Sequence, residues 1–204
     1  MHNRKAFLDA VPRQFLSRIL RIIFEGCASA YDKAKQYPKE FELDAIPPLR
    51  RLAVEPMLQD IQLPPGFRSS LIETPSTHYT KIESDVVVLT ALTRNVRRNW
   101  VRREPYRESL ANDGQTDMWA LLGYDTQEED TKRLYGLLIY GGPHNKRLPT
   151  VADLVFPLPD SGYFADDKID LMKEFPEIAA SYEQQDPQAE PRLRVVAKPK
   201  PVGE

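Results

Sequence analysis

The sequence predicts an α+β fold in which N-terminal helices pack on a mainly antiparallel sheet. Residues 1–63 carry apolar side chains at helical spacing, and residues 67–182 contain extended runs rich in Val, Ile, Thr and Tyr. Helices gathered at the start, followed by hairpin-like strands, are typical of this class. We expect one domain over residues 1–182, with its helical part at 1–63 and its sheet part at 67–182. A flexible, proline-rich tail at 183–204 is expected to follow.

The first expected helix covers residues 13–37. Pro12 fits its opening turn and Pro38 supplies a stop. Apolar residues recur in steps of three and four from Leu16 to Ala34, which places them on one face. Further apolar residues widen that face, so the helix is either deeply buried or makes a second apolar contact. Burial is the simpler interpretation; a homo-oligomer formed through this helix is the alternative.

A second helical stretch runs from residue 44 to about residue 61. Pro56 cannot donate a helical hydrogen bond, so the stretch is either one kinked helix or two short ones. The breaker Leu63-Pro64-Pro65-Gly66 then ends the helical part of the chain.

The middle of the chain favours strands. Residues 78–82 and 85–92 are rich in β-formers and are separated by a short polar connection, which predicts a hairpin. The four consecutive apolar residues at 86–89 indicate a strand covered on both faces.

A second antiparallel pair is expected from residues 133–140 and 151–156, joined by a long loop. A short helix should follow, running through Phe175, with Asp166 or Asp167 as its N-terminal cap.

Composition excludes two classes of protein. With 41% hydrophobic and 28% charged residues and a net charge of −2, the chain is neither fully disordered nor a polycation that coats nucleic acid. The small net charge conceals a split. Residues 1–107 hold 18 Lys and Arg against 12 Asp and Glu, a charge of +6, whereas residues 108–204 hold 10 against 18, a charge of −8. The two oppositely charged halves of the chain either attract each other or bind different partners.

Cysteine content limits the chemistry and the compartment. The single cysteine, Cys27, allows no intrachain disulfide and no cysteine-rich zinc site, and a reducing cytoplasm suits it best. Arginines interrupt the N-terminal apolar residues, and no run approaches the roughly 18 apolar residues that a membrane span needs. We therefore expect a cytoplasmic protein that neither enters nor contacts a membrane.

The most unusual local feature is a basic stretch at residues 94–107, which interleaves six arginines with two aromatic residues. Its candidate contact residues are Arg94, Arg97, Arg98, Trp100, Arg102, Arg103, Tyr106 and Arg107. Guanidinium groups suit phosphates and aromatic rings stack on unpaired bases, so the stretch has the chemistry of a nucleic-acid contact. The alternative is internal structure, with these arginines paired to Asp125, Glu128, Glu129 and Asp130 in the acidic half.

The loop at residues 141–147 is a second candidate for anion binding. Its two glycines can expose backbone amides, and His144, Lys146 and Arg147 can supply positive charge. The loop matches neither the phosphate-binding loop nor the dinucleotide fingerprint, so an ordinary hairpin tip is the alternative.

Two clusters of acidic residues are candidate metal sites. Pro159-Asp160 followed by Asp166-Asp167-Lys168 resembles the signature of the restriction-endonuclease-like nucleases over ten residues. That resemblance implies magnesium-binding carboxylates and a lysine that assists the attacking water. A second set consists of Glu83, Asp85 and Asp153. Acids at turns and helix starts are also expected on structural grounds alone.

These observations favour a non-catalytic cytoplasmic regulatory or accessory protein that binds a macromolecular partner through the basic stretch. The partner is nucleic acid or an acidic protein, and neither a cofactor nor a resident metal is expected. The three histidines are far apart, no GxSxG motif is present, and no catalytic residue is assigned. The alternative function is a metal-dependent nuclease or phosphodiesterase that uses Asp160, Asp166 and Lys168.

Overall fold

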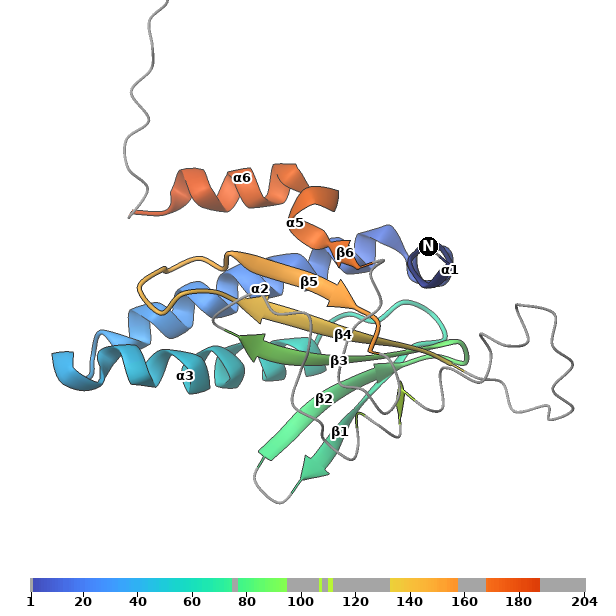
Figure 1. The fold of residues 1–204 in the computed structure, drawn as a ribbon, viewed down its shortest axis with the longest axis horizontal. Coiled ribbons are helices and arrows are strands. Elements are labelled where there is room, and N and C mark those ends of the chain that lie inside the picture. The colour runs from blue at the N-terminus through green and yellow to red at the C-terminus, as the bar shows by residue number, and fades with distance from the viewer. Residues whose placement is uncertain are drawn as a thin grey trace, which may run out of the picture.

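A computed structural model describes residues 2–74, 77–94, 107, 110–111, 133–157 and 168–187 (Figure 1). Its helices are α1 (His2–Ala10), α2 (Arg13–Ala34), α3 (Lys39–Gln59), α5 (Leu171–Glu174) and α6 (Pro176–Gln185). Its strands are β1 (Arg68–Thr74), β2 (Thr77–Glu83), β3 (Val87–Arg94), β4 (Leu134–Gly141), β5 (Val151–Val155) and β6 (Ile169–Asp170). N-terminal helices and a mostly antiparallel sheet confirm the α+β class.

The strands form one sheet in the order β1-β2-β3-β4-β5-β6. The expected hairpins β2–β3 and β4–β5 are confirmed, while β1, which the sequence did not indicate, pairs with β2. β3 and β4 run parallel, in register from Val87 opposite Leu134 to Arg94 opposite Gly141. The carboxyl ends of these two central strands therefore meet at one edge of the sheet.

Helices α2 and α3 pack along each other and cover one face of the sheet (Figure 1). Their contact is close at Gly26, where a Cβ atom would lie 2.4 Å from Cγ2 of Val54. The expected first helix is confirmed by α2. The second stretch is one helix that begins earlier than expected, at Lys39, and continues through three prolines.

Both faces of β3 are covered, as the apolar run predicted, but Val86, the first residue of that run, lies before the strand and is 52% exposed. Val87 and Leu89 contact the core under α1, α2 and α3, whereas Val88 belongs to a cluster on the opposite face with Leu137 and Ala111. Cys27 is fully buried, and burial raises the pKa of its thiol to about 12, which keeps it protonated and inert.

The C-terminal helical region begins later than the sequence indicated. Ile169 pairs with Leu154 in β6, and this pairing keeps it extended where a helix was expected. Asp170 caps α5 instead of Asp166 or Asp167, because its Oδ1 accepts a hydrogen bond from the Lys173 N–H at 3.3 Å. Residues 158–167 and the tail from residue 188 lie outside the described residues. In the described part of the chain, no helix is long and apolar enough to cross a membrane.

Candidate functional site

Two of the segments singled out by their charge meet at the carboxyl edge of β3 and β4. Arg94 ends β3, and its carbonyl oxygen accepts a hydrogen bond of 2.8 Å from the Gly142 N–H. Gly141 and Gly142 have backbone φ angles of +127° and +144°, which residues with a Cβ atom rarely adopt. The basic stretch thus starts where the loop at 141–147 leaves the sheet. We call this place the carboxyl edge, defined by Arg94, Gly141 and Gly142.

A buried arginine of α3 holds the loop in place. Arg50 is 1% exposed. Its Nη1 donates to the Gly142 carbonyl at 2.6 Å, and its Nη2 donates to the carbonyls of Pro143 at 3.2 Å and Lys146 at 2.8 Å. Burial lowers the pKa of Arg50. The three carbonyls turn toward this guanidinium, so the backbone of the loop satisfies a cation inside the protein.

Sequence reasoning missed Arg50, although a signal was present. Ile46, Val54 and Leu58 are buried on the sheet-facing side of α3, and Arg50 lies between them at the same four-residue spacing. An arginine in the centre of an apolar helix face has to find acceptors when the helix packs.

The three cations of the loop have different surroundings. Arg147 donates through Nε and Nη2 to Asp32 of α2, at 3.1 and 2.8 Å, and lies 3.7 Å from Asp186. The hydrogen bond between Arg147 and Asp32 raises the pKa of the arginine and lowers that of the carboxyl group. His144 is partly buried, and Lys146 is exposed. Lys146 is therefore the loop cation best placed to meet an anion from solvent.

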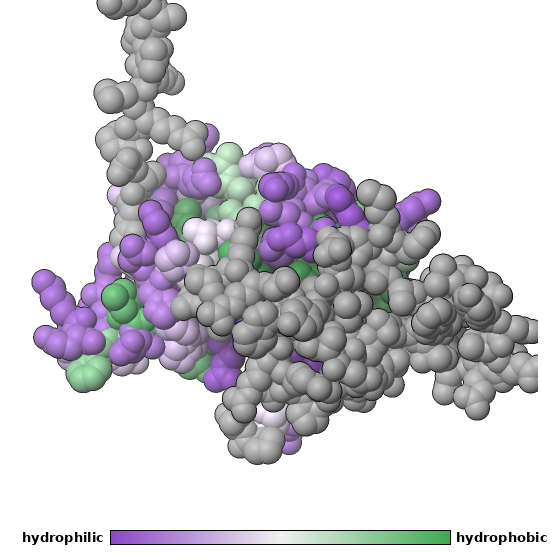
Figure 2. All heavy atoms as spheres, viewed as in Figure 1, coloured by the Kyte–Doolittle hydropathy of each residue, from purple (hydrophilic) through white to green (hydrophobic). Residues whose placement is uncertain are grey.

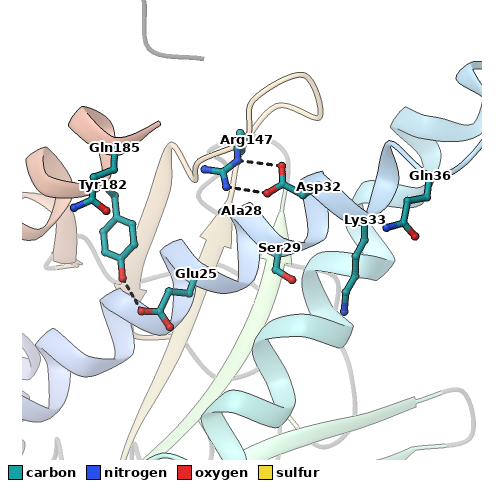
Figure 3. A pocket seen from close by; sticks show the side chains of 9 residues that line it. All are labelled: Glu25, Ala28, Ser29, Asp32, Lys33, Gln36, Arg147, Tyr182 and Gln185. Carbon is teal, nitrogen blue, oxygen red and sulfur yellow. Dashed lines mark hydrogen bonds and ion pairs between the residues drawn. The ribbon is translucent and has the colours of Figure 1, made fainter. Parts of the chain in front are cut away.

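Arg147 also lines a groove of about 540 Å³ between α2 and α6 (Figure 3). The lining residues are Glu25, Ala28, Ser29, Asp32, Lys33, Gln36, Arg147, Tyr182 and Gln185. Tyr182 donates a 2.7 Å hydrogen bond to Glu25 and stacks on Phe24 at 4.8 Å. Burial of the Tyr182 hydroxyl, together with its hydrogen bond to Glu25, raises the pKa of Tyr182 to about 12. The hydrogen bond between Tyr182 and Glu25 attaches α6 to α2, and the ion pair between Arg147 and Asp32 attaches the loop at 141–147 to α2. The polar residues that line the groove therefore hold these elements together.

The far end of the basic stretch is buried. Arg107 is 6% exposed, and its guanidinium carbon lies 5.6 Å from the centre of the Tyr79 ring. Nearby, the hydroxyls of Tyr135 and Thr90 are 2.8 Å apart. Arg107 thus anchors the stretch on the sheet face opposite α2 and α3. Outside the described residues lie Arg97, Arg98, Trp100, Arg102, Arg103 and Tyr106, and also the acidic residues Asp125, Glu128, Glu129 and Asp130.

The acidic side chains of the second metal hypothesis contact cations or solvent. Glu83 is held by Arg133 at 2.6 Å, Arg68 at 2.9 Å and Lys81 at 3.1 Å. Burial acts to raise its pKa, but the hydrogen bonds from these cations outweigh burial and lower it. Asp85 is exposed in the turn before β3.

Lys168 of the nuclease-like motif donates to Asp153 at 2.8 Å. Asp160 and Asp166 lie outside the described residues. Within the described part of the chain, no three His, Cys, Asp or Glu side chains are grouped as a metal site would require.

A buried acid on α3 makes stability depend on pH. Glu55 is 8% exposed; its Oε2 accepts the Thr80 N–H at 2.7 Å, and burial raises its pKa. The folded state should lose stability as the pH rises from the ordinary glutamate pKa, about 4.3, through the raised value, because the buried group must then ionise. We expect Glu55→Gln to remove this loss. Its free energy of unfolding, measured with urea, should rise relative to the parent protein as pH increases.

The exposed residue Glu40 of the same helix provides the control. Stability curves of Glu40→Gln and the parent protein should run parallel over the same pH range. A parallel curve for Glu55→Gln as well would show that Glu55 contributes nothing to the pH dependence.

The structure shows an α+β protein in which Arg94, at the end of β3, lies beside Gly141, where the loop at 141–147 begins. Comparison with protein-family models, with curated proteins and with solved structures finds no match for this chain.

Proposed function

We propose that this protein is a cytoplasmic accessory protein that binds single-stranded nucleic acid at the carboxyl edge. The observation that carries the proposal is the parallel pairing of β3 with β4, which brings Arg94 beside Gly141. This pairing joins the start of the basic stretch to the loop that presents Lys146. A phosphate backbone needs several cations along one path, and aromatic residues among the arginines supply stacking surfaces for unpaired bases.

The surrounding contacts support the same surface. Arg50 fixes the loop from inside, so Lys146 projects from a rigid backbone. Arg107 anchors the other end of the stretch against Tyr79. The contact residues proposed for the nucleic acid are Arg94, Arg97, Arg98, Trp100, Arg102, Arg103, Tyr106 and Lys146. Arg107 and Arg147 are proposed as positioning residues, because their guanidinium groups contact protein.

The test is the salt dependence of binding to a fluorescent single-stranded oligonucleotide of mixed sequence. We expect the triple variant Arg97→Ala, Arg98→Ala, Lys146→Ala to flatten the slope of log Kobs against log salt by about 2, because each lost phosphate contact contributes roughly 0.7 on a single strand. Fluorescence anisotropy over a range of salt concentrations measures both slopes.

A matched control removes two exposed positive charges away from the edge, Lys5 of α1 and Lys39 of α3. The Lys5→Ala, Lys39→Ala variant should keep the parent slope. Absence of binding at low salt, or an unchanged slope in the triple variant, would overturn the proposal. Binding to polyglutamate without binding to the oligonucleotide would assign an acidic protein as partner. Magnesium-dependent cleavage that Asp160→Ala abolishes would assign a nuclease.

A further inference from the structure

Three cations surround one buried carboxylate at the end of the sheet opposite the carboxyl edge. Glu83, the last residue of β2, is 5% exposed. Its Oε1 accepts a hydrogen bond from Nε of Arg68 at 2.9 Å, and its Oε2 lies 2.6 Å from Nη1 of Arg133 and 3.1 Å from Nζ of Lys81. We call Arg68, Lys81 and Arg133, with Glu83 between them, the Glu83 cluster.

The sheet brings these side chains together. Arg68 begins β1 directly opposite Glu83, and Lys81 lies two residues before Glu83 in β2, so the three side chains leave the same face of the sheet. Arg133 directly precedes β4, whose amino end lies beside the start of β3 (Figure 1). The Glu83 cluster is therefore held at the amino ends of the two central strands, roughly 20 Å along β3 from Arg94.

The Glu83 cluster holds more positive charge than its carboxylate requires. The lowered pKa of Glu83 keeps the carboxyl group ionised, so the cluster has a net charge of +2. A single cation is enough to pair with a buried carboxylate. In the described part of the chain, the charged groups of Arg68, Lys81 and Arg133 form no other hydrogen bond or ion pair. Asp85, the next acid in the sequence, is exposed and is not among their partners.

The cations keep most of their hydrogen-bond donors for a ligand. A guanidinium group has five N–H donors and an ammonium group has three, and Glu83 contacts one nitrogen of each side chain. The side chain of Arg68 is 75% exposed, that of Arg133 is 29% exposed and that of Lys81 is 24% exposed. The remaining donors can therefore be reached from solvent, while the buried carboxylate fixes their positions. Hydrophilic residues predominate among the described residues on the side that Figure 2 shows, so a polar ligand meets a polar surface there.

We propose that the Glu83 cluster binds the dianion of a phosphate group, either inorganic phosphate or a phosphate monoester. A phosphate monoester carries close to two negative charges at neutral pH and has three terminal oxygens that accept hydrogen bonds. The two charges balance the net charge of the cluster, and the three oxygens match its three cationic side chains. A phosphate inside a nucleic-acid strand carries only one charge and therefore fits the cluster less well. This site lies apart from the carboxyl edge and does not depend on the function proposed above.

Titration calorimetry with inorganic phosphate at low salt tests the site. We expect saturable binding of one phosphate per chain. The affinity should fall as the pH drops and the dianion gains a proton, because one of its two charges is then lost. Sulfate remains a dianion over the same range, so its affinity should not fall in this way.

Arg68→Gln removes one charge of the cluster at its most exposed position. We expect this variant to raise the dissociation constant for phosphate at least about 10-fold, because a hydrogen bond between two charged groups is lost. Lys81→Gln should raise it in the same direction. The matched control is Arg18→Gln, which removes another exposed arginine, one that donates to the Gln62 carbonyl, and it should keep the parent value. Circular dichroism spectra matching the parent protein would confirm that the variants fold.

Two oligonucleotides of one sequence distinguish the sources of the phosphate group. One carries a 5′-phosphate, which is a monoester, and the other carries a 5′-hydroxyl. Tighter binding of the phosphorylated strand, lost in Arg68→Gln, would assign the end of a nucleic-acid strand as the ligand. No difference between the strands, together with saturable binding of inorganic phosphate, would assign a small phosphate compound, even if neither strand binds at the carboxyl edge.

Three results would overturn the phosphate site. The first is a parent protein that shows no saturable binding of inorganic phosphate at low salt. The second is an equal loss of affinity in Arg68→Gln and Arg18→Gln. The third is an affinity for phosphate that does not change with pH, which would exclude the dianion as the bound form.

Discussion

Replacing Arg50 with alanine is expected to lower the free energy of unfolding by about 3–5 kcal/mol, one of the two largest effects of a single substitution in this protein. The guanidinium is 1% exposed and donates to three carbonyls of the loop that follows β4. Alanine leaves those acceptors without their donor and opens a cavity between α3 and the loop. Urea or guanidinium unfolding followed by circular dichroism measures the loss.

Arg18 provides the control for Arg50. It is also a helical arginine that donates to a backbone carbonyl, that of Gln62 at 3.2 Å, but this contact is exposed to solvent. Water can replace such a bond, so Arg18→Ala should cost less than about 1 kcal/mol. Equal losses for the two variants would mean that burial does not strengthen the contacts of Arg50.

Gly141→Ala is expected to destabilise the protein by about 3–4 kcal/mol, because two costs add at this position. The φ angle of +127° is unfavourable for any residue with a Cβ atom, and that Cβ would lie 2.3 Å from the carbonyl oxygen of Arg94. The oxygen belongs to the backbone of β3, so the clash is relieved only if the two strands separate at the carboxyl edge. Denaturant unfolding measures the total.

Gly66 separates the two costs. Its φ angle is +80°, but a Cβ atom there would have no neighbour within 4 Å. Gly66→Ala should therefore cost only the conformational part, about 1 kcal/mol. If Gly141→Ala proved no worse than Gly66→Ala, the close contact between Arg94 and Gly141 would have no energetic consequence. Gly141→Ala should also weaken oligonucleotide binding if the carboxyl edge is the site.

Local sequence patterns predicted the helices and most strands, but not which strands pair with each other. The helical period identified α2 because its apolar face continues from Leu16 to Ala34, over about five turns, and β-rich runs identified the hairpins. The sequence does not predict strand β1, because Arg68-Ser69-Ser70 is polar and the strand lacks the alternation of apolar and polar residues that a half-buried strand shows. In the structure Leu71 is 46% exposed. Pairing is a separate problem, since nothing in the runs at 87–94 and 134–141 distinguishes a parallel from an antiparallel neighbour.

The candidate site depended on contacts that are distant in sequence. Its cationic loop was identified from composition alone. Arg50 contacts carbonyls 92–96 residues further along the chain, and Asp32 reaches Arg147 across 115 residues. Such pairs are fixed by the packing of helices on the sheet, which a local spacing rule does not contain. Residue type therefore predicted charge at the edge, while the tertiary fold determined which charges face inward.

The strands β1–β3 and β4–β6 can each pair through connections that are short in sequence, but the parallel pair β3–β4 joins segments that are far apart in the chain. β1 to β3 can assemble through short hairpin connections, whereas joining β3 to β4 requires closing the long connection that begins after Arg94. Closing a long connection costs chain entropy before any contact is gained, so the centre of the sheet is expected to form late. The strands on the two sides belong to the positively and negatively charged halves of the chain, and their mutual attraction favours this final docking step.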